Sequence, residues 1–531
     1  MNNKALTVTV LTDTHYYSHK IGTSGAAYDH ANSKSQKFLA ESVSLLRQTF
    51  KQVVDDARSD IVIISGDITN NGELCSHEEI IQMLRELKSA GKRVYVITAT
   101  HDFRKGGVTD GYNADSKTVI PAATREILYD MYKEFGPDEA IAVHRQSMSY
   151  IVQLDSNYRL FALNDDSNLT GKSGFSDECF DWIAQQAEKA KADGQFIIAM
   201  THHPLIAPSP LYEIIGRGDM LGDYDIRIRQ LADLGIQFIF TGHTHIHNIS
   251  AYQSPEGNVL YDICSGCPIG YPGVMRSVTF EPDNGVVKVS TDFVEKPDDF
   301  SSDLTLKDAF EEQLIGVIKG MIKTAGEDID KLADMATSIS IKPKMIYKFG
   351  WVIKPIFKLL NSLKVGTVAK WSKKENGLKA SEYAEIKDKK VVDVITELVL
   401  NLYGGESKYP PETPTYRITI GFLKIIDSIL KTLKIDLKKI TKVSSSACEL
   451  IEPLLYNSKI DSYDADLKIF DFNSTEKLTW PEKRITVKDS KKGLPIIIAA
   501  VLAVIALLPI WLIIILIAFL NNQIKFREKL K

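Results

Sequence analysis

Cysteine is scarce in this sequence of 531 residues: the five present are Cys75, Cys179, Cys264, Cys267 and Cys448. An odd, scattered set argues against a disulfide framework and fits a reducing compartment. Cys264 and Cys267 have the spacing of half a zinc site, but no second pair accompanies them, so we interpret them as packing residues. The chain is too long for one hydrophobic core, and two or more domains are expected.

Histidine is missing from more than half of the chain, because all eleven histidines lie between His15 and His247. Charge is divided in the same way: residues 1–302 carry a net charge of −13, whereas residues 303–492 carry +6. The acidic part suits cation binding, and the lysines of the second part suit an anionic membrane surface or, equally, solvated helix faces. The acidic part lacks the basic footprint of nucleic-acid binding, so no nucleic-acid module is expected.

The two ends of the chain differ in their charged and apolar segments. The first residues lack a charged region followed by a long apolar core, so we expect no secretory signal and a cytoplasmic N-terminal part. Residues 494–520 lack charge altogether and are long enough to cross a hydrocarbon core of about 30 Å. We therefore expect a single transmembrane anchor at 494–520 and a basic tail at 521–531. Both flanks of the anchor are basic, so the side on which the tail lies stays open.

Apolar runs alternate with helical patterns in the first part of the chain. The predicted strands are residues 6–11, 60–65, 93–99, 150–154, 159–163, 195–200 and 236–240, and later strands include a hairpin around Asp283-Asn284-Gly285. This alternation predicts an α/β domain over residues 1–300. Lys-rich helical segments, broken by Pro and Gly, predict a mainly α-helical, basic accessory domain over residues 301–490.

Chemically active side chains stand directly after five of the predicted strands. They are Asp13-Thr14-His15, Gly66-Asp67, His101-Asp102, Thr201-His202-His203-Pro204 and Gly242-His243-Thr244-His245. Loops at the carboxyl ends of strands are where α/β sheets form their sites, and residues i and i+2 of an extended segment point the same way. Carboxylates with imidazoles suit Mn, Fe, Zn or Ni. These motifs hold more such groups than one tetrahedral ion needs, so two metal ions that share a bridging carboxylate are expected.

The order and spacing of these motifs resemble the calcineurin-like metallophosphoesterase superfamily, over about residues 5–295. The resemblance implies an αββα sandwich with a dinuclear centre of two metal ions, Mn, Fe or Zn, at the sheet edge. It implies that Asp13, His15 and His245 hold one metal, that Asp67 bridges, and that His202, His243 and the position of Thr100 hold the other. It also implies that His101 is the catalytic histidine and that Asp102 orients it.

One position departs from the family pattern, which has Gly-Asn before the catalytic histidine where this chain has Ala99-Thr100. A threonine side chain is shorter than asparagine, and its hydroxyl is a poorer neutral ligand than an amide oxygen. We therefore predict a second metal site that is weakened but present. The position three residues after the bridging aspartate is Asn70 instead of the tyrosine of purple acid phosphatases. The segments Gly-Asp-Ile-Thr-Asn-Asn-Gly at 66–72 and Thr-His-His-Pro at 201–204 resemble the cyclic-nucleotide phosphodiesterase branch, an analogy of sequence alone.

The resemblance implies a phosphohydrolase that cleaves a phosphomonoester or a phosphodiester through a metal-activated hydroxide, with His101 assisting the leaving group. Together with the segment at 494–520, it predicts a membrane-anchored enzyme. The alternative is a catalytically impaired metal-binding or interaction module of the same fold. A nucleotide and a lipid headgroup both remain open as the phosphoester substrate, as does the oligomeric state. The insertion at residues 104–136 is expected to overhang the site, and Arg104, Lys105 and Lys117 either contact phosphate or are solvated.

Overall fold

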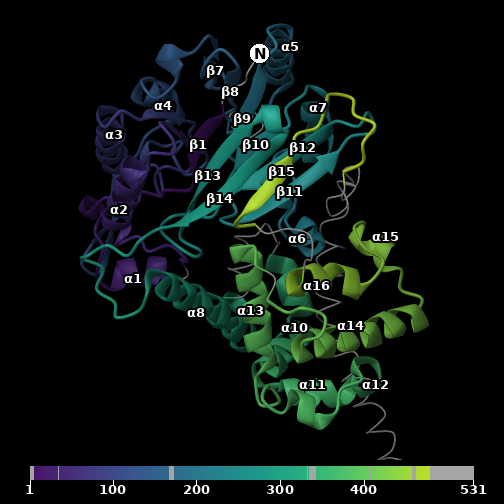
Figure 1. The fold of residues 1–531 in the computed structure, drawn as a ribbon. Helices are drawn as coiled ribbons and strands as arrows, with labels where there is room; N and C mark the ends of the chain where they lie inside the picture. The colour runs from purple at the N-terminus through teal and green to yellow at the C-terminus, as the bar shows by residue number, and fades with distance from the viewer. Residues whose placement is uncertain are drawn as a thin grey trace, which may run out of the picture.

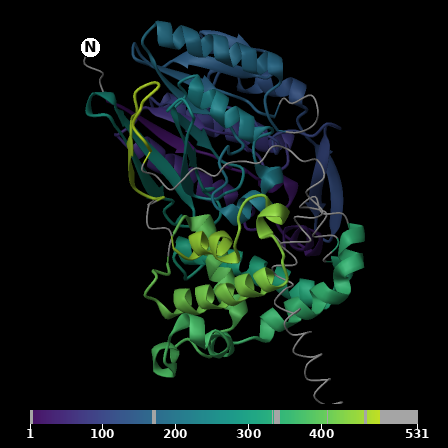
Figure 2. The same cartoon turned by 90° about the vertical axis from the view of Figure 1, so that its right-hand side faces the viewer.

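The computed structural model describes residues 5–33, 35–166, 173–331, 333, 343–406, 408–456 and 462–478. Two β-sheets lie face to face, and a group of helices lies below them in the views of Figures 1 and 2. The sheets are built from the first part of the chain, as the alternation of apolar runs predicts, with one strand added from much later in the sequence.

The first sheet has the strand order β15-β14-β13-β1-β2-β3. Its strands are β1 (Leu6–Leu11), β2 (Ile61–Ile64), β3 (Arg93–Val96), β13 (Val274–Glu281), β14 (Val286–Phe293) and β15 (Ala465–Lys468). The first three are parallel, and β13 joins β1 antiparallel. β13 and β14 form the hairpin predicted around Asp283-Asn284-Gly285, and Gly285 supplies the positive φ of 67° that the turn requires.

The second sheet has the strand order β11-β12-β10-β9-β8-β7-β6. Its strands are β6 (Ala142–His144), β7 (Ser149–Gln153), β8 (Tyr158–Ala162), β9 (Phe196–Met200), β10 (Phe238–Thr241), β11 (Asn248–Gln253) and β12 (Val259–Cys264). Strands β8, β9, β10 and β12 are parallel neighbours. Their residues are buried on both faces, which explains why they read as continuous apolar runs instead of alternating ones.

Three apolar layers hold the sheets and their helices together. Side chains such as Val10 and Ile63 from the first sheet meet Leu160 and Phe238 from the second in one buried cluster. The helices α2 (Ser42–Asp55) and α3 (Leu74–Ser89) pack on the outer face of the first sheet, and α5 (Asp177–Ala192) and α7 (Tyr224–Asp233) on that of the second. The mixed α/β architecture expected from the sequence is therefore confirmed, in four layers.

Shorter elements fill the connections. The insertion after the third strand forms the hairpin β4 (Val108–Asn113) and β5 (Ser116–Pro121), followed by α4 (Arg125–Tyr132). The others are η1 (His19–Ile21), α1 (Ala26–Asn32), η2 (Pro137–Glu139), α6 (Pro210–Ile215), η3 (Arg217–Asp219) and η4 (Pro282–Asn284). The hairpin packs so closely on the chain before α1 that a Cβ at Gly22 would lie 2.2 Å from the carbonyl oxygen of Tyr112.

The second part of the described chain is helical, as predicted. Its helices are α8 (Leu306–Glu327), α10 (Pro343–Ser362), α11 (Val365–Trp371), α12 (Lys373–Asn376), η5 (Ala380–Tyr383), α13 (Val391–Gly404), α14 (Pro414–Thr432), α15 (Leu437–Thr441) and α16 (Ala447–Leu455). Thr305 caps the N-terminus of helix α8, where its hydroxyl accepts the N–H of Asp308 at 3.1 Å.

The helical region is tied to the sheets at several points. Phe310 of α8 packs on Phe38, with ring centroids 5.0 Å apart, and the carbonyl of Tyr403 in α13 accepts the N–H of His247 at 2.8 Å. After α16 the chain returns to the first sheet, where β15 pairs antiparallel with β14 (yellow beside teal in Figure 1). This strand was not predicted from the sequence.

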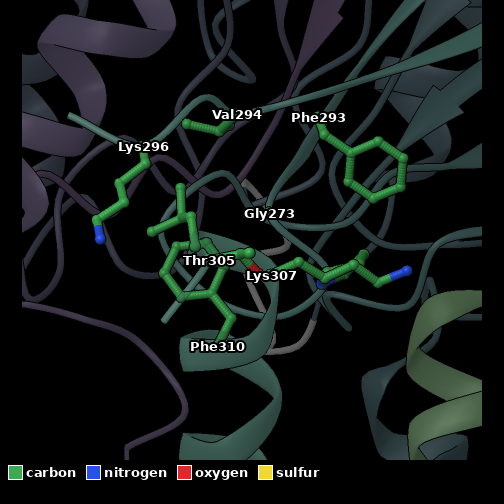
Figure 3. Close-up of a pocket in the computed structure, with 9 residues that line it drawn as sticks. Gly273, Phe293, Val294, Lys296, Thr305, Lys307 and Phe310 are labelled. Carbon is green, nitrogen blue, oxygen red and sulfur yellow. The ribbon is translucent and has the colours of Figure 1, made fainter. Parts of the chain in front are cut away.

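An apolar cavity of about 450 Å³ lies where α8 joins the ends of β13 and β14 (Figure 3). Phe293, Val294 and Phe310 line it, with Lys296 and Lys307 among the other lining residues. None of the lining residues is a candidate metal ligand, so this cavity is separate from the site described below.

No helix in the described part of the chain is long and apolar enough to cross a membrane. The transmembrane segment predicted at 494–520 and the basic tail at 521–531 lie outside the described residues.

Candidate metal centre

Backbone strain marks the strand ends that the sequence analysis singled out. Five of the candidate ligands have positive φ angles: Asp13 (51°), His15 (41°), Asp67 (50°), His243 (63°) and His245 (56°). A left-handed conformation in a residue with a side chain costs on the order of 1–3 kcal/mol and concentrates at functional sites. Here the unusual turns direct side chains from β1, β2 and β10 to one place.

Three of these residues form the first ligand group: Asp13, His15 and His245. The Nε2 atoms of His15 and His245 lie 3.0 Å apart, and Asp13 Oδ1 lies 3.3 Å from His245 Nε2 and 3.6 Å from His15 Nε2. Two ligands that are each about 2.1 Å from one metal ion are about 3.0–3.4 Å apart at ordinary coordination angles. The group therefore has the spacing of a ligand set around one ion.

Asp67, His202 and His243 form the second ligand group. His202 Nε2 lies 3.1 Å from Asp67 Oδ2. Asp67 also belongs to a third group with His15 and His101, so it lies between the two sets as a bridging carboxylate must. Asp13 Oδ1, His202 Nε2 and His243 Nδ1 are buried atoms without a hydrogen bond to any residue that the structure describes. Buried polar atoms are rarely left unpaired, and a pair of divalent ions fits these three atoms as ligands.

The buried carboxylates of the cluster favour the binding of cations. Burial opposes ionisation of Asp13 and Asp67, yet the surrounding histidines hold the pKa of both carboxyls well below the usual range. Burial likewise opposes a charge on His202, but Asp67 and Asp13 raise its pKa to about 10. The pKa of His245 also rises to about 10, against burial, because of Cys267 and Asp13. His202 and His245 therefore hold protons that metal ions would displace, whereas burial lowers the pKa of His15 and His243 and favours their neutral, metal-binding form.

Hydrogen bonds from the sheets orient the ligands. His202 Nδ1 bonds to the carbonyl of Ser65 at 2.8 Å, which leaves Nε2 toward Asp67. Asp13 Oδ2 accepts the hydroxyl of Thr12 at 2.8 Å and the N–H of His243 at 2.9 Å. Such outer partners fix ring orientation and ligand basicity.

The structure brings His101 to the cluster but gives Asp102 a different place from the predicted one. Nδ1 of His101 bonds to the carbonyl of Asn70, not to Asp102. Asp102 is buried and accepts the N–H groups of Thr69 and Ala99, each at 2.8 Å. The prediction that Asp102 orients the imidazole is corrected by these contacts. Its side chain instead joins the loops after β2 and β3 through these two backbone donors.

The charge states of this pair follow from burial. Burial lowers the pKa of His101, although Asp67 opposes the shift. Burial and Asp67 raise the pKa of Asp102 to about 8, while its two backbone donors oppose the rise.

Thr100, the position that departs from the family pattern, is exposed. Its carbonyl oxygen accepts a long hydrogen bond of 3.4 Å from Arg104. Arg104 also donates to the side chain of Asn71, whereas Lys117 pairs with Asp110 at 2.6 Å and Lys105 is exposed. Of Arg104, Lys105 and Lys117, Arg104 is the one bonded to the loops of the metal centre.

Three residues next to the ligands were not predicted from the sequence. Gln36 Nε2 bonds to His245 Nδ1 at 2.9 Å, and Lys37 Nζ donates to Asn70 Oδ1 at 2.7 Å. Asp165 holds the ring of His203 at 3.1 Å, and that ring lies 4.1 Å from the ring of His243. Gln36 and Lys37 belong to a loop without a motif. The position of Asp165 after β8 was a signal that could have found it.

Comparison with known proteins agrees with this geometry. Residues 6–247 match the sequence model of the calcineurin-like phosphoesterase family. These residues are a calcineurin-like phosphoesterase domain. The match spans all five strand ends and every candidate ligand, so the resemblance stated from the motifs is confirmed. The chain is accordingly a metal-dependent phosphoesterase, a hydrolase of phosphoester bonds.

Solved structures with similar folds are distant in sequence. A dimetal phosphatase from Danio rerio is 13% identical, with a TM-score of 0.38 over 54% of this chain and 95% of that one. GAP50, the anchor in the inner membrane complex of Plasmodium, is 10% identical, with a TM-score of 0.32 over 59% and 95%. A conserved uncharacterized protein from Streptococcus pneumoniae, described as a predicted phosphoesterase, is 12% identical, with a TM-score of 0.18 over 54% and 90%. A search of curated proteins finds no significant match.

Proposed function

We propose that this calcineurin-like phosphoesterase is a membrane-anchored hydrolase with two metal ions that cleaves a phosphomonoester or a phosphodiester. The observation that carries the proposal is the convergence of two ligand groups that share Asp67. Asp13, His15 and His245 would hold one ion, and His202 and His243 the other, with Thr100 beside the second. Mn, Fe and Zn all suit this mixture of carboxylates and imidazoles.

Bound at these ligands, two ions would supply Lewis acidity and a hydroxide nucleophile near neutral pH. The protein positions the ligands. The turns with positive φ angles, and the hydrogen bonds made by ligand atoms that do not face the ions, hold the ligand side chains in place before substrate binds. Asp67 donates no proton, because its carboxyl is ionised at neutral pH and accepts the N–H of His101 at 2.9 Å.

His101 is the group that we assign to the leaving oxygen. Its Nδ1 is engaged by the carbonyl of Asn70, so the other ring nitrogen is left for the substrate. A protonated imidazole there can donate from Nε2 to the departing alkoxide or to a phosphoryl oxygen, whereas the single N–H of a neutral imidazole is already used by Asn70.

The test is hydrolysis of p-nitrophenyl phosphate and bis(p-nitrophenyl) phosphate by the whole protein with added Mn²⁺. We expect turnover that is abolished by a chelator and by Asp67→Asn. The matched control is Asp181→Asn, a change at an exposed position of α5. Absence of turnover over a panel of metals and esters would favour the alternative, a catalytically impaired binding module. The exposed Thr100 is the observation in favour of that alternative.

Membrane attachment is proposed from residues 494–520, which contain no charged side chain. Two central lysines, at Leu507 and Ile513, should release the protein from membranes in an alkaline carbonate wash. The reason is that each charge at the centre of a span costs about 2.5–3.5 kcal/mol. Lysines at Asn521 and Asn522 are the matched control, and they should leave the protein bound. Release of the unaltered chain would contradict the anchor.

A further inference from the structure

The loop of residues 35–38 places a lysine beside the candidate catalytic histidine. Lys37 Nζ donates to the side-chain oxygen of Asn70 at 2.7 Å, and the main-chain carbonyl of the same Asn70 accepts from His101. The two groups of one residue thus hold the ammonium of Lys37 and the imidazole of His101 on the same side of the metal centre.

Lys37 has no carboxylate within 4.0 Å among the residues that the structure describes. The same is true of Arg104, which donates to the side chain of Asn71, the next residue along the loop after β2. An ammonium carries three N–H donors, and one contact with Asn70 uses one of them. Lys37 is half-buried, and a cation in such a position usually has its N–H groups paired. The N–H donors of Lys37 that Asn70 does not use are therefore available to an anion bound at the metal centre.

The lysine is held rigidly. Its backbone pairs with Gly270 in an isolated bridge, and the N–H of Phe38 bonds to the carbonyl of Ile269 at 2.8 Å. On the other side, Gln313 of α8 donates to the carbonyl of Ser35 at 2.8 Å. The helical region therefore supports the loop, and Lys37 is positioned before substrate arrives.

We propose that Lys37 binds a terminal oxygen of the substrate phosphate and selects phosphomonoesters over phosphodiesters. This inference rests on the proposed function and specifies its substrate class. A phosphomonoester has three terminal oxygens and a charge near −2 at neutral pH, whereas a phosphodiester has two terminal oxygens and a charge of −1. A third cation beyond the two metal ions matches the additional oxygen and its charge. In a diester an ester group would face the lysine instead.

The test compares two esters with the same leaving group, p-nitrophenyl phosphate and bis(p-nitrophenyl) phosphate, at about pH 8, where the monoester is a dianion. Lys37→Met should lower kcat/KM for the monoester about 10- to 100-fold, the effect of one charged hydrogen bond, and change the diester less than about threefold. Lys37→Arg should restore part of the loss. Lys51→Met, at an exposed position paired with Asp55, should change neither ester.

A second measurement does not depend on turnover. Isothermal titration of the Mn²⁺-loaded protein with inorganic phosphate should show a loss of affinity of about 10-fold or more in Lys37→Met. An equal loss on both esters, or an unchanged affinity for phosphate, would overturn the role of Lys37. If the unaltered protein hydrolyses neither ester, the proposed function fails, and the phosphate titration alone then decides the role of Lys37.

Discussion

His77 Nε2 and the main-chain carbonyl of Asp102 lie 2.8 Å apart, and this hydrogen bond fastens helix α3 to the loop that carries His101. The other ring nitrogen of His77 bonds to the hydroxyl of Tyr132 at 2.7 Å. A neutral imidazole has one donor and one acceptor nitrogen, so both are satisfied without a charge. Burial accordingly lowers the pKa of His77 to about 4.

This pKa predicts how stability depends on pH. The unfolded chain binds a proton at His77 with a pKa of about 6.5, so protonation favours unfolding between about pH 6.5 and pH 4. The contribution of His77 is fully present above that window and is lost as the pH falls through it, by about 3 kcal/mol. Denaturant unfolding of chelator-treated protein should show this loss, and His77→Gln should reduce it. An equal acid dependence in protein and variant would refute the assignment.

Asp102 provides a second prediction. Removing its carboxylate in Asp102→Ala leaves the buried N–H groups of Thr69 and Ala99 without partners. We expect a loss of stability of about 2–5 kcal/mol, because each unpaired buried donor costs about 1–3 kcal/mol. Thermal unfolding measures it, and Asp181→Ala, at an exposed position, is the control. If both variants unfold at the same temperature as the parent, Asp102 does not join the two loops.

The third prediction concerns Thr100 and the affinity of the second metal site. Thr100→Asn supplies the amide oxygen that the family pattern has at this position, and we expect the second Mn²⁺ to bind about tenfold or more tightly. The measurement is a calorimetric titration of metal-free protein, in which the second binding step should shift and the first should not. An unchanged second step would show that residue 100 does not reach the ion.

The fourth prediction concerns His101 as the proton donor to the leaving group. His101→Ala should lower kcat for phenyl phosphate about 100-fold or more, because the phenoxide needs a proton. The loss on p-nitrophenyl phosphate should be smaller, since that leaving group is stable as an anion. Equal losses on both esters would indicate that His101 stabilises the phosphoryl oxygens instead.

The sequence was sufficient to predict the strands, which have continuous apolar runs, and the ligands, which belong to short motifs. The continuous apolar runs around Val10, Ile63 and Phe240 place strands, and the strand ends place Asp13, Asp67 and His245 in one cluster. Residues that reach the site through tertiary contacts could not be predicted. Lys37 is near the metal centre because its loop pairs with Gly270, more than two hundred residues later. Likewise, β15 has four residues and no distinct pattern until β14 provides an edge for it.

The position of Asp102 was also beyond the sequence. An His-Asp pair next to each other in the chain suggests a contact between their side chains. The turn from Ala99 to Asp102, closed by a hydrogen bond of 3.0 Å, instead directs the carboxylate to the backbone of residues 69 and 99. The local backbone conformation determines which group the Asp102 side chain contacts, and this conformation cannot be predicted from the residue types alone.

The central claim is that two metal ions are bound between these strand ends and share Asp67. Anomalous diffraction at the manganese edge, from crystals of the whole protein grown with Mn²⁺, tests it most directly. We predict two peaks, one among Asp13, His15 and His245 and the other between His202 and His243, with Asp67 touching both. One peak, or none at these ligands, would contradict the account.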